Sequence, residues 1–206
     1  IALGTATDAY QPFERRQRLT RALLEVLLET RHPVSVVTKS SLIVRDIDLW
    51  AELAQLNLAH VGISLTTLDG PLARQLEPRA SAPPARLEAM RRLSEAGIPV
   101  SVFVAPLIPG LNDHEMERLL TTARDHGAGS AGYTLLRLPH EVAGMFRQWL
   151  DWHAPEKAAR VMSVAGPGEV LVPASVREIV PGAGIAFTEH GVHQLKGLER
   201  EFRLFK

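Results

Sequence analysis

The chain of 206 residues contains no cysteine. It therefore has no disulfide, no thiolate nucleophile, no zinc–thiolate site and no cysteine-ligated iron–sulfur cluster of its own. An excess of charge of one sign is also lacking, because 23 basic and 23 acidic residues give a formal net charge of +0. This balance gives no indication of a nucleic-acid partner or of an acidic partner surface.

Long apolar runs are absent as well. No segment approaches the roughly 18 consecutive apolar residues of a membrane-spanning helix, and no signal peptide opens the chain. We therefore expect a cytoplasmic protein without a membrane partner. Because the chain starts at Ile1, inside an expected strand, we also expect that an upstream piece is missing. The oligomeric state is not predicted.

The segment from residue 100 to 115 combines a strand end, a turn and a helix start. Its first five residues are largely β-branched, which predicts a strand buried on both faces. Pro106 cannot donate a ladder hydrogen bond, so the predicted strand stops there. Gly110 permits a positive φ, and Asn112 or Asp113 can cap the following helix. Ligands bind at such strand ends in parallel α/β folds, although an ordinary βα loop shows the same pattern.

Short apolar segments alternate with amphipathic helical patterns along residues 1–152. The predicted strands are 1–4, 34–38, 61–65, 100–104 and 131–136, and the predicted helices are 13–29, 46–56, 72–76, 83–96, 114–126 and 141–152. Repeated strand–helix units predict an α/β fold with a parallel sheet and right-handed crossovers.

Polar side chains follow the ends of the predicted strands. Because the carboxyl ends of parallel strands meet at one edge, we expect a rim suited to an amphipathic small molecule. Helix capping is an alternative explanation of the Ser, Thr, Asp and Asn residues, but it does not explain Lys39. The rim consists of Thr5, Thr7, Asp8, Lys39, Ser40, Ser64, Thr66, Ile108, Asn112 and Arg137.

After about residue 160 the pattern changes. Glycine–proline breaks at 166–168 and 181–184 separate short predicted strands at 169–172, 185–188 and from 192 onward, with a short helix at 173–180. Alternating apolar and polar residues are typical of antiparallel strands. We therefore expect a short α+β tail with an antiparallel hairpin, and we divide the chain into domains 1–157 and 158–206.

Six motifs occur in order along the strand–helix series, at residues 4–14, 37–40, 64–67, 76–80, 105–113 and 135–141. In this order and spacing they make residues 1 to about 160 similar to the radical S-adenosylmethionine superfamily, specifically to its branch related to spore photoproduct lyase. The resemblance implies an incomplete parallel (β/α)6-type partial barrel, whose cofactor lies across the strand ends.

The resemblance also implies S-adenosylmethionine as the small-molecule cofactor. By position, Lys39 and Ser64 correspond to ligands of the methionine end, and Ile108 corresponds to an apolar contact for adenine. Weaker candidates, for holding ribose, carboxylate or loop geometry, are Thr5, Asp8, Thr66, Arg79 and Asn112.

The family holds a 4Fe–4S cluster with three cysteines on a loop after its first strand, and this chain has none. Protein side chains cannot supply the electron that reductively cleaves the sulfonium. We therefore expect the cysteine loop to precede Ile1. This chain would retain part of a cofactor pocket and would not catalyse radical chemistry.

The segments 158–162, 165–172, 193–197 and 202–205 carry a second resemblance, to the C-terminal end of class III adenylate/guanylate cyclase domains. By position, Arg160 could match the transition-state arginine and Lys196 a phosphate-contacting lysine, although solvated surface charges explain both. The expected asparagine falls at Glu156, and the metal-binding aspartates have no counterpart.

Three functions follow from these resemblances: a fragment of a radical S-adenosylmethionine, iron–sulfur-dependent enzyme that is inactive as this chain, a nucleotide cyclase remnant, and a non-catalytic chimera. The eight histidines show no metal-ligand spacing, so no metal site is predicted. Spacings of three between Phe146, Trp149 and Trp152 predict packing in the core.

Overall fold

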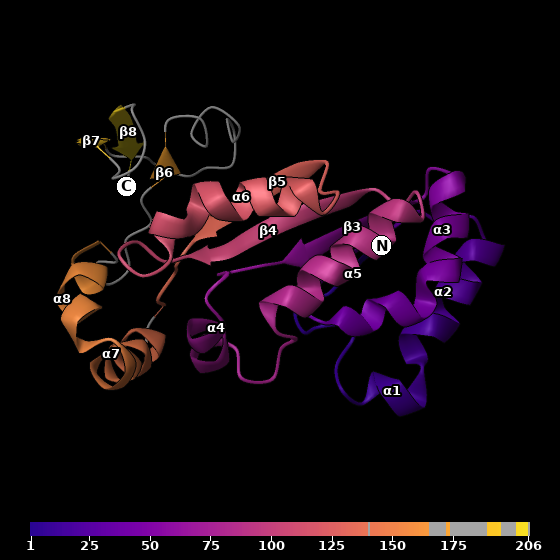
Figure 1. Ribbon diagram of the computed structural model, residues 1–206, viewed down its shortest axis with the longest axis horizontal. Coiled ribbons are helices and arrows are strands. Elements are labelled where there is room, and N and C mark those ends of the chain that lie inside the picture. Colours follow the sequence, from indigo (N-terminus) through magenta and orange to yellow (C-terminus); the bar gives the residue numbers. More distant parts are fainter. Residues whose placement is uncertain (140, 165–171, 174–188, 195–200, 206) are drawn as a thin grey trace. The chain divides into compact units, whose positions relative to one another are not determined.

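The computed structural model describes residues 1–139, 141–164, 172–173, 189–194 and 201–205 (Figure 1). The chain forms two compact units. The first contains Ile1–Leu107 and Glu115–Leu135, and the second contains Ile108–His114 and Leu136–Lys206.

The first unit contains a five-stranded sheet in which all neighbours are parallel and the strand order follows the sequence. Its strands are β1 (Ala2–Leu3), β2 (Val34–Thr38), β3 (Ala59–Ser64), β4 (Val100–Leu107) and β5 (Ser130–Leu135). This arrangement confirms the predicted α/β class and is consistent with a partial (β/α) barrel.

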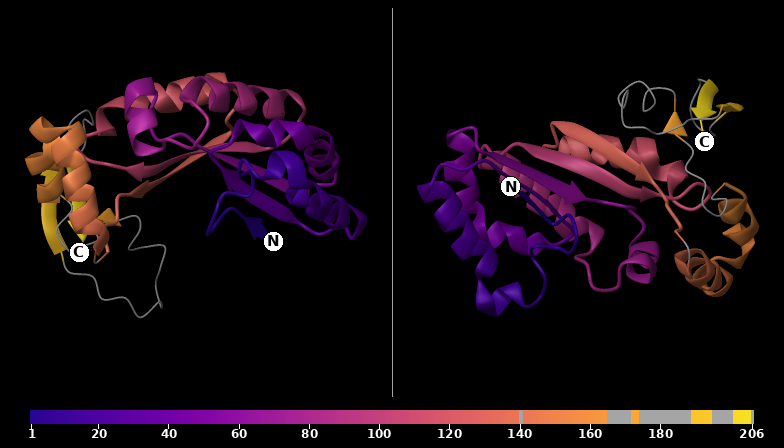
Figure 2. Two further views of the ribbon diagram at one scale, coloured as in Figure 1. Left: turned by 90° about the horizontal axis from the view of Figure 1, so that it is seen from below. Right: turned by 180° about the vertical axis from the view of Figure 1, so that it is seen from behind.

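Helices connect the successive strands. They are α1 (Glu14–Gln17), α2 (Leu19–Glu29), α3 (Ile47–Gln55), α4 (Gly70–Leu76), α5 (Pro83–Glu95) and α6 (Met116–Asp125), with short 3-10 helices η1 (Ser41–Asp46) and η2 (Asp113–Glu115). Of these, α2, α3, α5 and α6 pack on one face of the sheet (Figure 2). Because strand side chains alternate between faces, every second residue faces these helices. Val36, Ile63 and Val102 lie in the resulting core.

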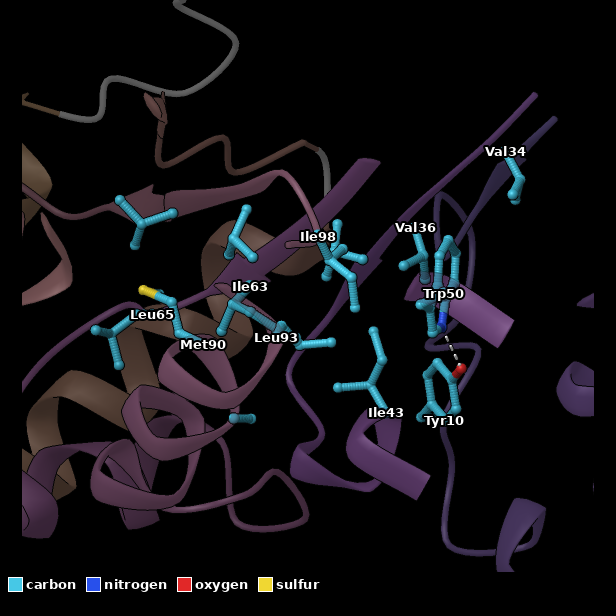
Figure 3. Close-up of a cluster of buried hydrophobic side chains, with 14 of the residues drawn as sticks. Tyr10, Val34, Val36, Ile43, Trp50, Ile63, Leu65, Met90, Leu93 and Ile98 are labelled. Carbon is cyan, nitrogen blue, oxygen red and sulfur yellow. Dashed lines mark hydrogen bonds between the residues drawn. The ribbon is translucent and has the colours of Figure 1, made fainter. Parts of the chain in front are cut away.

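The core near β2 contains two large buried aromatic side chains (Figure 3). The indole N–H of Trp50 donates a hydrogen bond of 2.9 Å to the hydroxyl of Tyr10. Burial, together with the nearby Asp46 carboxylate, raises the pKa of Tyr10 far above its ordinary value despite that bond. The Tyr10 phenol is therefore neutral and structural, and it accepts the hydrogen bond of an indole N–H that would otherwise be buried without a partner.

The structure corrects three predicted boundaries. The helix predicted over 13–29 is interrupted at Arg18, whose φ of 53° is left-handed. The helix predicted from residue 46 starts at Ile47, after η1. Strand β4 continues past Pro106 to Leu107, and its pairing with β5 shifts register between Val104 and Leu107. This bulge accommodates a residue that cannot donate to the ladder.

The second unit contains helices α7 (Glu141–His153) and α8 (Pro155–Val164) and a three-stranded antiparallel sheet. The strands are β6 (Val172–Pro173), β7 (Glu189–Gln194) and β8 (Glu201–Phe205), in the order β6-β8-β7. Pairing of β7 with β8 confirms the predicted antiparallel hairpin. The elements predicted within 165–171 and 174–188 lie outside the described residues, and the domain boundary at residue 157 stays a prediction.

The aromatic side chains of α7 form a stack. Ring centroids lie 5.5 Å apart for Phe146 and Trp149, and 4.8 Å apart for Trp149 and His153. Trp152 is 80% exposed, so its predicted place in the core is wrong. Trp152 follows Trp149 by three residues, which is less than one helical turn, and it lies on the part of the α7 surface that faces solvent.

Within the described part of the chain, no helix combines the length and apolar character needed to span a membrane.

Candidate functional site

Lys39 directly follows β2, and Ser64 is the last residue of the neighbouring parallel strand β3. Thr38 of β2 pairs with Ile63 of β3, and Lys39 and Ser64 are the next residues along their strands. Alternation along the strands assigns both to the sheet face opposite the helices. The structure therefore places these two candidates at neighbouring strand ends, where Ser64 is buried and its hydroxyl donates a bond of 3.5 Å to the Ala105 carbonyl. Their role as cofactor ligands stays a prediction.

Glu77, which directly follows α4, joins this pair to a buried network. Its Oε1 accepts a hydrogen bond of 2.9 Å from the Thr66 hydroxyl and lies 2.7 Å from the Lys39 ammonium. Its Oε2 accepts a bond of 2.6 Å from the Arg86 guanidinium. Side-chain exposure is 2% for Arg86, 10% for Glu77 and 37% for Lys39. Charge thus extends from the interior at Arg86 to solvent at Lys39.

Arg86, on α5, also binds the main chain around the site. Its Nε donates to the Ser81 carbonyl at 2.6 Å, and its Nη1 donates to the Ser64 carbonyl at 2.9 Å. A buried guanidinium is stable only when a counter-ion and acceptors satisfy it, and Glu77 and the two carbonyls do so. The end of β3 is therefore tied to the same carboxylate that binds Lys39.

The charge state of Glu77 follows from two opposing effects. Burial alone would raise the pKa of the Glu77 carboxyl, but the positive charge of Arg86 and the bond to Lys39 outweigh it, and the pKa lies below its ordinary value. Glu77 is therefore ionised at neutral pH.

Asp8 fixes the loop that carries Lys39. Its carboxylate accepts hydrogen bonds from the Thr38 hydroxyl at 2.6 Å, the Lys39 main-chain N–H at 2.8 Å and the Tyr10 main-chain N–H at 2.8 Å. Of the three roles that the sequence left open for Asp8, these contacts favour loop geometry.

Glu115, at the end of η2, fixes the loop after β3. Its carboxylate accepts hydrogen bonds from the Thr67 hydroxyl and, at 3.1 Å, from the Leu68 main-chain N–H. The neighbouring Thr66 bonds to Glu77. Two buried acids therefore hold consecutive threonines at this strand end.

Ile108 and Asn112 lie in the second unit, in one turn. The Asn112 side chain accepts a 2.6 Å hydrogen bond from the Ile108 N–H, and Gly110 has the expected positive φ of 83°. Asn112 therefore closes the turn. The sequence offered Asn112 or Asp113 as the cap of the following helix, whereas α6 starts at Met116 with Glu115 at its N-cap, after η2. The predicted place of these residues beside Lys39 stays a prediction.

The rim candidates Thr5 and Arg137 are exposed, and so is Arg79, a candidate from the family resemblance. Sequence reasoning selects Arg79 from the motif at 76–80 and misses Glu77. A signal for Glu77 exists: a carboxylate just after a helix C-terminus opposes the helix dipole, so it needs cationic partners. Arg86 and Glu115 carry no comparable signal.

Two glycines leave room for the ring of Phe103 of β4 on the sheet face opposite the helices. A Cβ on Gly62 of β3 would lie 2.5 Å from the Phe103 ring, and one on Gly132 of β5 would lie 2.9 Å from it. The ring thus lies over both neighbouring strands, and Phe103 is itself the residue of β4 that pairs with Ser64.

The residues present do not fit an iron–sulfur cluster, because the chain offers no thiolate. Among the described residues, no three His, Asp or Glu side chains gather in a way that could hold a metal ion. The partly exposed ammonium of Lys39 does fit the carboxylate of an amino-acid ligand.

The fold and this site define a parallel βα protein with a candidate small-molecule site at its strand ends. A family model described as the Radical SAM superfamily matches residues 1–123. The chain belongs to the radical SAM superfamily.

Uncharacterised relatives support this assignment. The chain is 35% identical over 184 residues to the uncharacterized protein Rv2578c of Mycobacterium tuberculosis, covering 87% of the chain and 53% of that protein. It is 34% identical over 115 residues to the uncharacterized protein MJ0683 of Methanocaldococcus jannaschii, covering 56% of the chain and 43% of that protein. The chain spans about half the length of the curated mycobacterial relatives that it matches.

Proposed function

We propose that this chain is the S-adenosylmethionine-binding part of a radical S-adenosylmethionine enzyme, of the branch similar to spore photoproduct lyase. One observation carries the proposal: the partly exposed Lys39 ammonium follows the end of β2, 2.7 Å from an ionised Glu77, and the neighbouring parallel strand β3 ends at Ser64. An amino-acid carboxylate is the chemical group that such an ammonium binds.

The residues of this chain bind and orient the ligand. Lys39 and Ser64 would hold the methionine end, and Asp8 fixes the main chain of Lys39. Ile108 would contact adenine, and Thr66, through Glu77, would stabilise the strand end. In a complete enzyme, the cofactor supplies a deoxyadenosyl radical. That chemistry requires cluster ligands that this chain does not contain, so the chain alone should bind S-adenosylmethionine without cleaving it.

The C-terminal segment 158–206 is either derived from a cyclase or part of the same natural protein as residues 1–157. A relative that aligns with 87% of the chain necessarily aligns across residue 157, because the uncovered part is shorter than the segment 158–206. This supports continuation, and we propose that the tail belongs to the same protein as the barrel segment. The side chains of Arg160 and Lys196 lie outside those that the structure describes.

Isothermal titration calorimetry of S-adenosylmethionine into the 206-residue chain tests the proposal. We expect saturable binding that weakens about tenfold or more in Lys39→Ala, which loses a charge-assisted bond. Arg92→Ala is the control, because Arg92 is an exposed cation of the same unit, on α5. Absence of heat, or equal affinity in wild type and Lys39→Ala, would reject the pocket.

A further inference from the structure

Lys39 is a flexible cation that must be held in place to act as a specific ligand. Its four-carbon stem loses rotamer freedom when it binds, and this cost weakens binding unless the protein has already fixed the ammonium. The bond of 2.7 Å to Glu77 fixes it in the ligand-free chain.

Glu77 is well suited to this task because it is itself fixed. Arg86 holds one carboxylate oxygen at 2.6 Å, and the Thr66 hydroxyl holds the other at 2.9 Å. Arg86 is in turn fastened to two main-chain carbonyls. The position of the Lys39 ammonium is thus determined by a buried chain of contacts that starts on α5.

The same contacts determine which charge the site accepts. Arg86, Glu77 and Lys39 are two cations and one anion, arranged in alternation with a cation at the exposed end. An ammonium has three donors, and the bond to Glu77 uses one of them. A single anion at Lys39 extends the alternation and balances the charge.

We propose that Glu77 is a positioning residue that makes this site selective for the carboxylate of its ligand. The inference rests on the proposed function, in which that carboxylate belongs to the methionine end of S-adenosylmethionine. Both oxygens of Glu77 already accept bonds from protein groups, so Glu77 is not available to bind the ammonium group of the ligand. The site therefore recognises the carboxylate of the ligand through Lys39.

The test compares two ligands, S-adenosylmethionine and its decarboxylated analogue, by calorimetry on the full chain. We expect wild type to bind S-adenosylmethionine about tenfold more tightly than the analogue. In Glu77→Gln, binding of S-adenosylmethionine should weaken about fivefold, binding of the analogue should hardly change, and the preference should largely disappear. Glu88→Gln removes a carboxylate of the same charge from the exposed face of α5 and should preserve the preference.

The sign of the effect makes this test decisive. Removal of a negative charge near a cation should strengthen anion binding if only electrostatic attraction mattered, whereas loss of positioning weakens it. Equal or tighter binding of S-adenosylmethionine by Glu77→Gln overturns the inference, and so does an equal loss for both ligands, which would indicate a merely structural role.

Glu77→Asp covers the case in which the glutamine variant does not fold. It keeps the charge but is one methylene too short to hold Arg86 and Lys39 together, so its preference should fall between those of wild type and Glu77→Gln. An unchanged preference in Glu77→Asp would overturn the inference. If wild type binds neither ligand, the proposed function itself fails, which is a separate result.

Discussion

At the scale of single residues, the candidate site depends on acids and a buried arginine more than on the residues chosen from sequence. Lys39 and Ser64 come at the ends of neighbouring strands because of the register of β2 and β3, and register follows from the apolar pattern of these strands. Glu77 and Arg86 come from the loop after α4 and from α5, and only tertiary packing brings them to the strand ends. Periodicity predicts faces of elements, but it does not predict such pairings.

The depressed pKa of Glu77 predicts how stability varies with pH. A carboxyl whose folded pKa lies below its unfolded value stabilises the fold above the unfolded pKa, and this contribution is lost as the pH falls through the folded pKa. Wild type should therefore be more stable than Glu77→Gln at pH 7, and the difference should shrink in acid. Urea unfolding between pH 7 and pH 3 measures it.

High salt provides the control for this comparison. Glu88 also has a lowered pKa, chiefly through its hydrogen bond to Arg91, but its side chain is exposed, so salt screens its contribution. The contribution of the buried Glu77 network should persist in 1 M salt. A stability gap between wild type and Glu77→Gln that is independent of pH would contradict the assignment.

At the scale of elements, the sequence predicted the strands better than the interruptions within helices and strands. Strand β2 was predicted at its observed bounds and the starts of β4 and α5 were also right, because β-branched runs and an opening proline pair give strong local signals. The left-handed Arg18 carries no such signal. Nor does the bulge that lets β4 continue through Pro106, because it depends on pairing with β5.

Helix α2 offers a matched pair of substitutions. Leu24 is completely buried in the core, whereas its neighbour Leu23 is 36% exposed. Leu24→Ala should cost about 2–5 kcal/mol of unfolding free energy because it leaves a cavity. Leu23→Ala should cost clearly less, about 1 kcal/mol or below. Chemical denaturation of both variants gives the comparison, and equal losses would contradict the placement of the helix face.

The sheet face around Phe103 gives a second test at this scale. Gly62→Ala places a methyl group within 2.5 Å of the ring and should destabilise the first unit by about 1–3 kcal/mol, as overpacking does. In a Phe103→Ala background the same substitution should be nearly neutral. A double-mutant cycle with thermal unfolding measures this coupling, and additive losses would show that the contact does not limit packing.

At the scale of the whole molecule, membership of the radical SAM superfamily favours ligand binding, whereas the lack of cysteine argues against radical formation by this chain. The family match covers residues 1–123, which include β1 to β4 and the Lys39–Glu77–Arg86 network. Cluster chemistry needs thiolates that these residues do not supply. Ligand binding and radical formation should therefore be separable in this chain.

Anaerobic incubation with iron and sulfide tests that separation. The chain should bind no 4Fe–4S cluster, measured as the absence of bound iron and of the broad visible absorption of such a cluster after gel filtration. With a strong reductant and S-adenosylmethionine it should form no 5′-deoxyadenosine, although calorimetry on the same preparation still detects binding. About four bound irons per chain, or deoxyadenosine that increases with chain concentration, would contradict this division, because a cluster would then be held without cysteine.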